Sequence, residues 1–306
     1  MKTIKLSLLS LSLILISGSA NAQYRGGIHR AVERDIERNI ERKAEQKAEE
    51  RRSKGEAEAE KALDRAAAKI EEAQKAQEEA DAKVADIPDE IPAVGNSPYT
   101  PSESEFAFFA MRKGAVQVFA SKDAKGKVTG QTRNTIKEIT GAKNAFAVAY
   151  KSEVLDAQGK PNKDNPMVLN YRVVVKDGIM YLDMKGMFGA MDGLDGVQAS
   201  GTTLKIPNNL TVGQTLNDAK AKVKIGPINC VAVITEGKCL AIENVTVEAG
   251  TFRCYKITQK TDVTVMGIKT EATTLTWYAK GVGAVKTETY NKKGVLQSTQ
   301  ELISNR

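Results

Sequence analysis

A stretch rich in proline divides the chain into two parts that cannot share one run of secondary structure. Four of the eight prolines lie between Asp86 and Pro101. Each proline fixes its own φ angle and lacks a backbone N–H donor, and it keeps the preceding residue out of the helical region. A helix therefore cannot continue through this stretch. We predict a linker over residues 87–101 with an independent segment on either side.

The segment before the linker, residues 23–86, has the composition of a long helix. From Ile28 to Ala85 it contains no proline and one glycine, and it consists mainly of residues with high helix propensity. Its second half repeats apolar residues with heptad spacing, but alanine fills half of these positions, so the coiled-coil seam buries little apolar area. We predict a charged α-helical stalk that is either solvated on its own or paired, through self-association or with a coiled-coil partner.

The first 22 residues, 1–22, have the features of a secretory signal peptide. Two lysines precede an apolar run from Leu6 to Ile16, and Ala20 and Ala22 are the small residues expected before cleavage at Gln23. No cysteine follows the apolar run, so no thioether-linked lipid is expected. We predict an exported, soluble protein of the periplasm or the cell exterior, neither a lipoprotein nor an integral membrane protein.

Residues 102–306 change from helical to strand-like periodicity. Short runs of alternating or branched residues, such as 116–119 and 146–150, are separated by turn sequences such as Lys176-Asp177-Gly178 and Asn291-Lys292-Lys293-Gly294. Turns this brief leave no room for crossover helices, so the strands are expected to be antiparallel. Because wide flat sheets are unusual, the predicted fold class is mainly β: an antiparallel meander of about eight to eleven strands, strongly twisted and curled into an open barrel, preceded by the stalk.

Three stretches of this β domain carry a family resemblance. Residues 243–257, ENVTVEAGTFRCYKI, resemble the E-x-V-T-V-P-A-G-T-F-x-C-x-K-I hairpin of TapB-like envelope proteins, with Glu248 in place of proline, and residues 277–288, WYAKGVGAVKTE, resemble a second signature. Residues 206–216 resemble a weaker third. The resemblance covers about Tyr99 to Ile303 and implies an exported bacterial β domain of unknown function, and it brings no catalytic assignment to carry over. We interpret the signature positions as structural: Gly250, Phe252, Trp277, Tyr278, Gly281 and Gly283.

Three cysteines, Cys230, Cys239 and Cys254, lie in the β domain of a chain expected in a compartment that permits disulfides. Cys230 and Cys239 flank an expected turn at residues 236–238, which favours a bridge between them, and a Cys239–Cys254 bridge is the alternative. The one histidine, His29, lies far from all three in the sequence. A Cys–His nucleophile or a Ser–His–Asp triad is therefore not expected, and a structural role is predicted for the sulfurs.

No metal, cofactor or nucleotide site is predicted. Scattered cysteines and one histidine do not give the paired spacing of a zinc site, and no glycine-rich phosphate loop precedes a helix. Asp192 and Asp195 could contact calcium but lack the further acidic ligands of a complete loop. The formal charge of +7 is spread over single lysines with little aromatic interleaving, which argues against nucleic-acid binding. We expect a protein that is not an enzyme and has no cofactor.

A run of methionines interspersed with glycines stands out in the β domain. It comprises Met180, Met184, Met187 and Met191, with Phe188 among them. Thioether ligands could bind Cu(I), but methionine is also the adaptable apolar residue of lids and loose surfaces. The pattern favours a core edge or a flap over an apolar space, with a lid over a ligand or partner as the second interpretation.

Taken together, these features predict a non-enzymatic envelope protein that binds an apolar small molecule, a lipid or an envelope protein through its β domain. The alternative is a structural or assembly protein that acts through its helical stalk.

Overall fold

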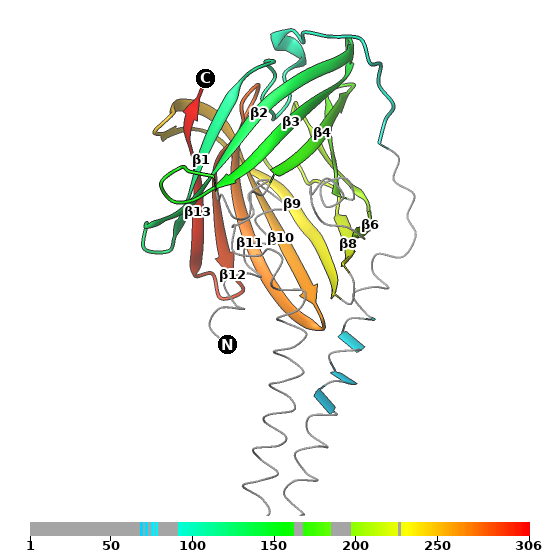
Figure 1. The fold of residues 1–306 in the computed structure, drawn as a ribbon, viewed down its shortest axis with the longest axis vertical. Helices are drawn as coiled ribbons and strands as arrows, with labels where there is room; N and C mark the ends of the chain where they lie inside the picture. The colour runs from blue at the N-terminus through cyan, green and yellow to red at the C-terminus, as the bar shows by residue number, and fades with distance from the viewer. Residues whose placement is uncertain are drawn as a thin grey trace, which may run out of the picture.

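The computed structural model describes residues 68–69, 71–72, 75–76, 78, 91–161, 168–184, 197–225 and 228–306. Within these ranges the chain forms thirteen strands and one 3-10 turn, η1 (Glu103–Glu105). Figure 1 shows them coloured along the chain: β1 (Val116–Asp123), β2 (Val128–Ala142), β3 (Ala145–Leu155), β4 (Val168–Lys176), β5 (Ile179–Asp183), β6 (Val197–Gly201), β7 (Thr203–Pro207), β8 (Ala219–Ile225), β9 (Ile228–Val247), β10 (Gly250–Val265), β11 (Ile268–Ala279), β12 (Gly283–Asn291) and β13 (Leu296–Asn305).

The strands form a single sheet in which every pairing is antiparallel. Its order is β6-β8-β9-β10-β11-β12-β13-β1-β2-β3-β4-β5-β7. Tight turns join most neighbours. Asp177 and Gly178, for example, have φ angles of 51° and 74°, the conformation that a two-residue hairpin loop requires, and they join β4 to β5. The predicted antiparallel sheet is therefore confirmed, but it is not a simple meander, because β6 pairs with β8 and β7 pairs with β5.

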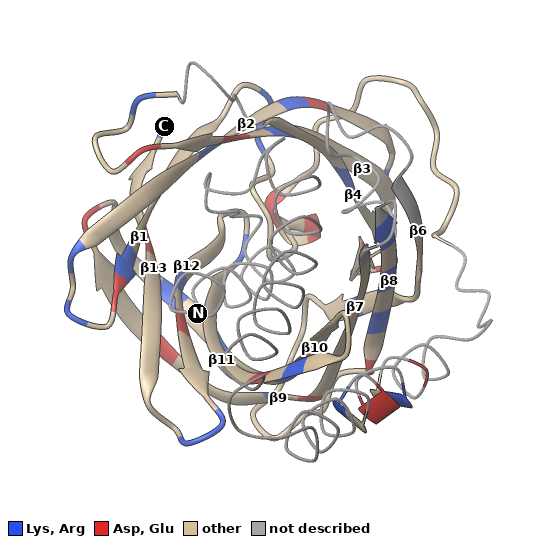
Figure 2. Ribbon diagram, turned by 60° about the horizontal axis from the view of Figure 1, so that its bottom comes forward, with Lys and Arg blue, Asp and Glu red and all other residues tan. Residues whose placement is uncertain are grey.

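The two edge strands of this sheet are consecutive in the chain, and together they nearly close it into a barrel (Figure 2). β6 pairs with β8 and β7 pairs with β5, with only Thr202 between them. The Asn217 side chain continues the hydrogen bonding across this seam, because its Oδ1 accepts from the Lys205 N–H at 2.8 Å and its Nδ2 donates to the Thr203 carbonyl at 2.9 Å. One continuous segment thus bridges both edges of the sheet.

The core lies inside this barrel. Val148 on β3 and Ile257 on β10 belong to the same core cluster, although five strands separate β3 from β10 in the sheet order. Side chains on such distant strands can meet only across the interior of a curled sheet. Buried and partly exposed residues alternate along most strands, so one face of each strand points inward.

The predicted fold class needs two corrections. The sheet has thirteen strands, because segments such as β2, which contains two glycines and an asparagine, and β8, which is rich in alanine and lysine, form strands although these residues are depleted in strands. Secondly, a long α-helical stalk is not supported. No α-helix is present among the described elements, only seven residues between 68 and 78 are described in helical conformation, and the rest of the predicted stalk lies outside the described residues.

The stalk prediction relied on helix propensity, which is a local signal. Helices in proteins are stabilised mainly by packing of an apolar face, and a seam half filled with alanine offers little to pack. The predicted coiled coil and the alternative function through a stalk lose their structural basis with it. The described part of the predicted linker is packed rather than free, since the Tyr99 N–H donates to the Ile139 carbonyl of β2 at 2.9 Å.

Candidate functional site in the barrel interior

The inner face of the barrel is apolar over β9, β8, β7, β5, β4 and β3. Inward positions on these strands carry branched or aromatic residues because alternate positions of a half-buried strand face the core. We call this surface the apolar wall. Representative members, each at most 1% exposed, are Val148, Val173, Met180, Ile206, Ala221 and Ile234.

An aromatic strap, residues 99–111, packs across the barrel between the two sides of the sheet. The Phe108 ring centroid lies 4.9 Å from that of Tyr255 on β10 and 6.1 Å from that of Tyr278 on β11. The Phe109 ring lies 5.1 Å from that of Tyr150 on β3. Figure 1 shows η1, which is part of the strap, at the upper end of the barrel. The strap therefore lies over that end of the apolar wall.

Glu105 fixes the strap to the β2–β3 hairpin. Its carboxylate accepts hydrogen bonds from the Asn144 N–H at 2.8 Å, the Ser102 hydroxyl at 2.7 Å and N–H at 3.0 Å, and the Tyr99 hydroxyl at 2.8 Å. Burial alone would raise the pKa of this carboxyl, but the hydrogen bonds from Asn144, Ser102 and Tyr99 outweigh that effect and lower the pKa to about 2. The anchor is a carboxylate held by neutral donors.

On β10 to β13 and β1, buried threonine, serine and glutamine side chains share the inner face with core residues such as Ile257 and Tyr278. Residues directly opposite each other share a face of the sheet, and Thr276 opposes Thr287, which opposes Gln300. Thr276 lies two residues before Tyr278 of the main core, so this row points inward. None of the side chains is charged. We define the polar patch by its buried residues, which are Ser121, Gln259, Thr261, Thr274, Thr276, Thr287, Thr289 and Gln300.

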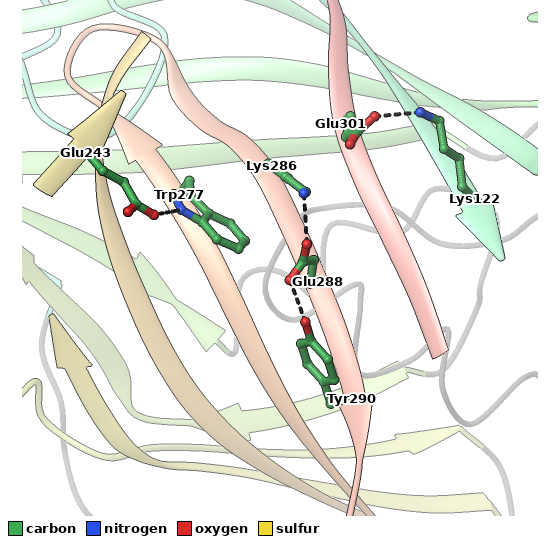
Figure 3. Close-up of polar contacts among 7 residues, drawn as sticks. All are labelled: Lys122, Glu243, Trp277, Lys286, Glu288, Tyr290 and Glu301. Atoms are coloured by element: carbon green, nitrogen blue, oxygen red, sulfur yellow. Dashed lines mark hydrogen bonds and ion pairs between the residues drawn. The ribbon is translucent and has the colours of Figure 1, made fainter. Parts of the chain in front are cut away.

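The outer face of β9 to β12 carries a charged network, part of which is shown in Figure 3. The Trp277 indole N–H donates to Glu243 Oε1 at 2.6 Å (Figure 3). The Nζ atoms of Lys256 and Lys286 lie 4.7 Å and 5.3 Å from the Trp277 ring centroid. Lys286 also pairs with Glu288 at 2.8 Å. Partly exposed ion pairs contribute little stability, whereas lysines over an indole face shield it from water. We interpret this network as a cover for Trp277.

The signature residues lie on both sides of the sheet. Tyr278 belongs to the main core, whereas Trp277 packs in a second, smaller cluster with Phe252 against it. Gly250, Gly281 and Gly283 have positive φ angles of 130°, 70° and 101°. A side chain at Gly281 would also meet the Phe106 ring of the strap, with 2.5 Å between a built Cβ and Phe106 Cδ2.

The predicted disulfide is wrong, and so is its alternative, because all three cysteines are free and buried. The expected turn at residues 236–238 does not exist. β9 runs through it, so Cys230 and Cys239 lie on one strand, nine residues and therefore roughly 30 Å apart. Cys239 belongs to the main core and Cys254 to the smaller cluster, so these two sulfurs face opposite sides of the sheet.

The predicted methionine flap is described only in part. Met180 and Met184 are buried, at 1% and 0% exposure, in the main core. Met187, Phe188 and Met191 lie outside the described residues, as do Asp192 and Asp195.

Sequence reasoning missed both the strap and the polar patch. A signal for the strap was present, since Phe106, Phe108 and Phe109 form an apolar cluster directly after the prolines. The signal for the patch was the threonines at alternate positions of β11 and β12, but the same pattern is equally typical of a strand face exposed to solvent.

Comparisons with known proteins agree on the fold. A crystal structure of a candidate exported protein with a YmcC-like fold from Bacteroides fragilis superposes with a TM-score of 0.56 at 19% identity, over 66% of this chain and 99% of that one. A candidate lipoprotein from Parabacteroides distasonis superposes with a TM-score of 0.56 at 21% identity, again over 66% and 99% of the two chains. No curated protein matches the sequence.

One of these structures overturns the predicted localisation. The Parabacteroides protein is described as a candidate lipoprotein, so the prediction of a chain that is not a lipoprotein is withdrawn. Among the described segments, no helix has the length and hydrophobicity needed to cross a membrane. The TapB-like resemblance is not confirmed, because the family model that matches, over residues 112–302, is the DUF3108-like one. This match covers most of the β domain and more than half of the sequence, and the chain therefore belongs to the DUF3108-like family.

Proposed function

We propose that this protein is an exported binding protein that takes an apolar ligand, such as a lipid chain, against the apolar wall of its barrel. The observation that carries this proposal is the continuity of the wall. It extends from β9 across the β6–β7 seam to β3 as one cluster, and the aromatic strap lies over one end of it. Apolar surfaces enclosed by a barrel with few polar groups are typical of sites for small apolar molecules.

The raised pKa values of the three thiols also favour a binding role over thiol catalysis. Burial raises the pKa of Cys230 to about 12, and burial with the nearby Glu243 carboxylate raises that of Cys254 to about 12. Burial raises the pKa of Cys239 as well. Thiols in this state are protonated and poorly nucleophilic. Among the described residues, no group of three His, Cys, Asp or Glu side chains could hold a metal ion.

Dye uptake tests the proposal. The wild-type protein is expected to bind the apolar dye 1-N-phenylnaphthylamine, and Ala221→Leu, which adds volume at a fully buried inner position, is expected to weaken dye binding at least fivefold. The matched control is Ala241→Leu. Ala241 on β9 lies opposite Lys256, and the Lys256 side chain packs over Trp277 on the outer face, so Ala241 also faces outward and its replacement should leave dye binding unchanged.

Chemical unfolding of the same variants separates a binding site from a packed core. Overfilling a packed core costs about 1–3 kcal/mol of unfolding free energy. A loss of that size in Ala221→Leu with unchanged dye binding, or no dye binding by the wild type, would overturn the proposal.

A further inference from the structure

Four side chains of the polar patch carry a buried polar atom with no hydrogen-bond partner in the described part of the chain. The atoms are Gln259 Nε2, Thr261 Oγ1, Thr289 Oγ1 and Gln300 Nε2. All four residues are at most 2% exposed. Buried polar atoms are nearly always hydrogen-bonded, because an unbonded one has lost water without gaining a substitute. Four of them in one patch therefore need a common explanation.

The four atoms come from neighbouring positions on one face. Thr274 directly opposes both Gln259 and Thr289, so these two residues are separated only by Thr274. Gln300 lies two residues beyond Ser298, which opposes Thr289. A single small group could therefore reach several of these side chains at once.

The chemistry of the patch indicates which kind of group it can accept. Two carboxamide nitrogens donate hydrogen bonds, and two hydroxyls can donate or accept. No charged residue belongs to the patch, and a buried ion without a counter-charge is strongly unfavourable. The patch thus suits an uncharged group that carries hydroxyl or carbonyl oxygens.

The patch also adjoins the apolar wall. Thr261 on β10 directly opposes Ile234 on β9, which belongs to the wall. We propose that the ligand is a neutral amphiphile, whose chain lies against the apolar wall while an uncharged, hydroxyl-bearing head group, such as a sugar, binds the polar patch. This inference rests on the proposed function and specifies its ligand class.

The test compares amphiphiles that share one chain and differ in the head group. Binding of n-octyl β-D-glucoside, n-octyl sulfate and octyltrimethylammonium is measured by calorimetry on the full chain, each below its critical micelle concentration. We expect the glucoside to bind at least tenfold more tightly than either charged probe. Removing two donors in the double variant Gln259→Leu/Gln300→Leu should weaken glucoside binding about fivefold to thirtyfold and abolish the preference.

Two further variants keep the test informative if the double variant folds poorly. Thr289→Val removes one hydroxyl at nearly constant volume and should weaken glucoside binding severalfold. Gln297→Leu is the matched control for the glutamine variants. Gln297 lies on β13, as Gln300 does, but its amide donates to the Val295 and Leu296 carbonyls instead of facing the patch, so this variant should keep the preference for the glucoside.

The outcomes separate this inference from the proposed function. If the wild type binds neither the apolar dye nor any octyl probe, both fail. If the dye binds but the glucoside is not preferred, or if the preference survives in the patch variants, only the neutral-amphiphile inference is overturned. A rise in melting temperature of Thr289→Val with unchanged glucoside affinity would likewise overturn it, because it would show that the patch holds only buried water.

Discussion

Glu105 shows how one side chain positions a whole segment. Its carboxylate gathers donors from Tyr99, Ser102 and Asn144, and so joins the strap to the turn between β2 and β3. The folded-state pKa of about 2 lies below the value of about 4.3 expected in the unfolded chain. The carboxylate therefore stabilises the fold fully above about pH 4.3, and this contribution is lost as the pH falls towards 2.

Glu105→Gln is expected to lower the free energy of unfolding by about 1.5–3 kcal/mol at pH 7, because charge-assisted hydrogen bonds are lost. It should also remove part of the pH dependence of stability between about pH 4.3 and 2. Urea unfolding at pH 7 and at pH 3 measures both effects. Glu103→Gln, at an exposed position of the same turn, is the control and should stay within about 0.5 kcal/mol. An identical pH dependence in wild type and Glu105→Gln would contradict this role.

At the scale of elements, the strap depends on close backbone contact with the turn after β11. The Gly281 N–H donates to the Ala107 carbonyl at 2.8 Å, and the Phe106 ring occupies the space that a side chain at Gly281 would need. The conformation and the contact both require glycine here, because φ is 70°.

Gly281→Ala should therefore destabilise the fold by about 2–4 kcal/mol, combining the strain of a positive φ with the clash against Phe106. Hydrogen exchange of the strap amides should accelerate at the same time. Gly294→Ala is a matched control, since its φ is 73° but nothing lies within 4 Å of a built Cβ. If the two variants lose equal stability, the contact with Phe106 contributes nothing.

At the scale of the whole molecule, one short segment nearly closes the barrel. β6 and β7 pair with different neighbours, and the Asn217 amide continues the ladder where β8 has not yet begun. Closure matters because open sheet edges expose unpaired backbone groups.

Asn217→Ala is expected to weaken this seam without affecting the far side of the barrel. The Lys205 amide loses its acceptor, so its hydrogen exchange should accelerate about fivefold or more, while amides of β11 and β12 stay unchanged. Asn244→Ala, at an exposed position of β9, is the control. Uniform acceleration across all strands would show that the barrel opens only by global unfolding.

The sequence by itself determined the antiparallel β architecture, because turns are encoded locally. Asp177-Gly178 and Asn291 to Gly294 carry the residues that tight turns require, and each joins two paired strands in the structure. Local patterns were misleading where pairing with a neighbouring strand decides whether a segment forms a turn or a strand. Glu236 and Gly237 resemble a turn, yet β9 continues through them because β10 pairs with it on both sides of the irregularity, and this keeps Cys230 apart from Cys239.

Only the tertiary structure decided which residues meet inside the barrel. The strap reaches Tyr150, Tyr255 and Tyr278, which lie far from it and from each other in the sequence. The polar patch likewise depends on the register of several strands, and a shift of one residue would turn its side chains to the outer face. Alternation along a strand shows that two faces differ, but it does not show which face is enclosed. That choice is made when the sheet curls and the β6–β7 segment bridges its two edges.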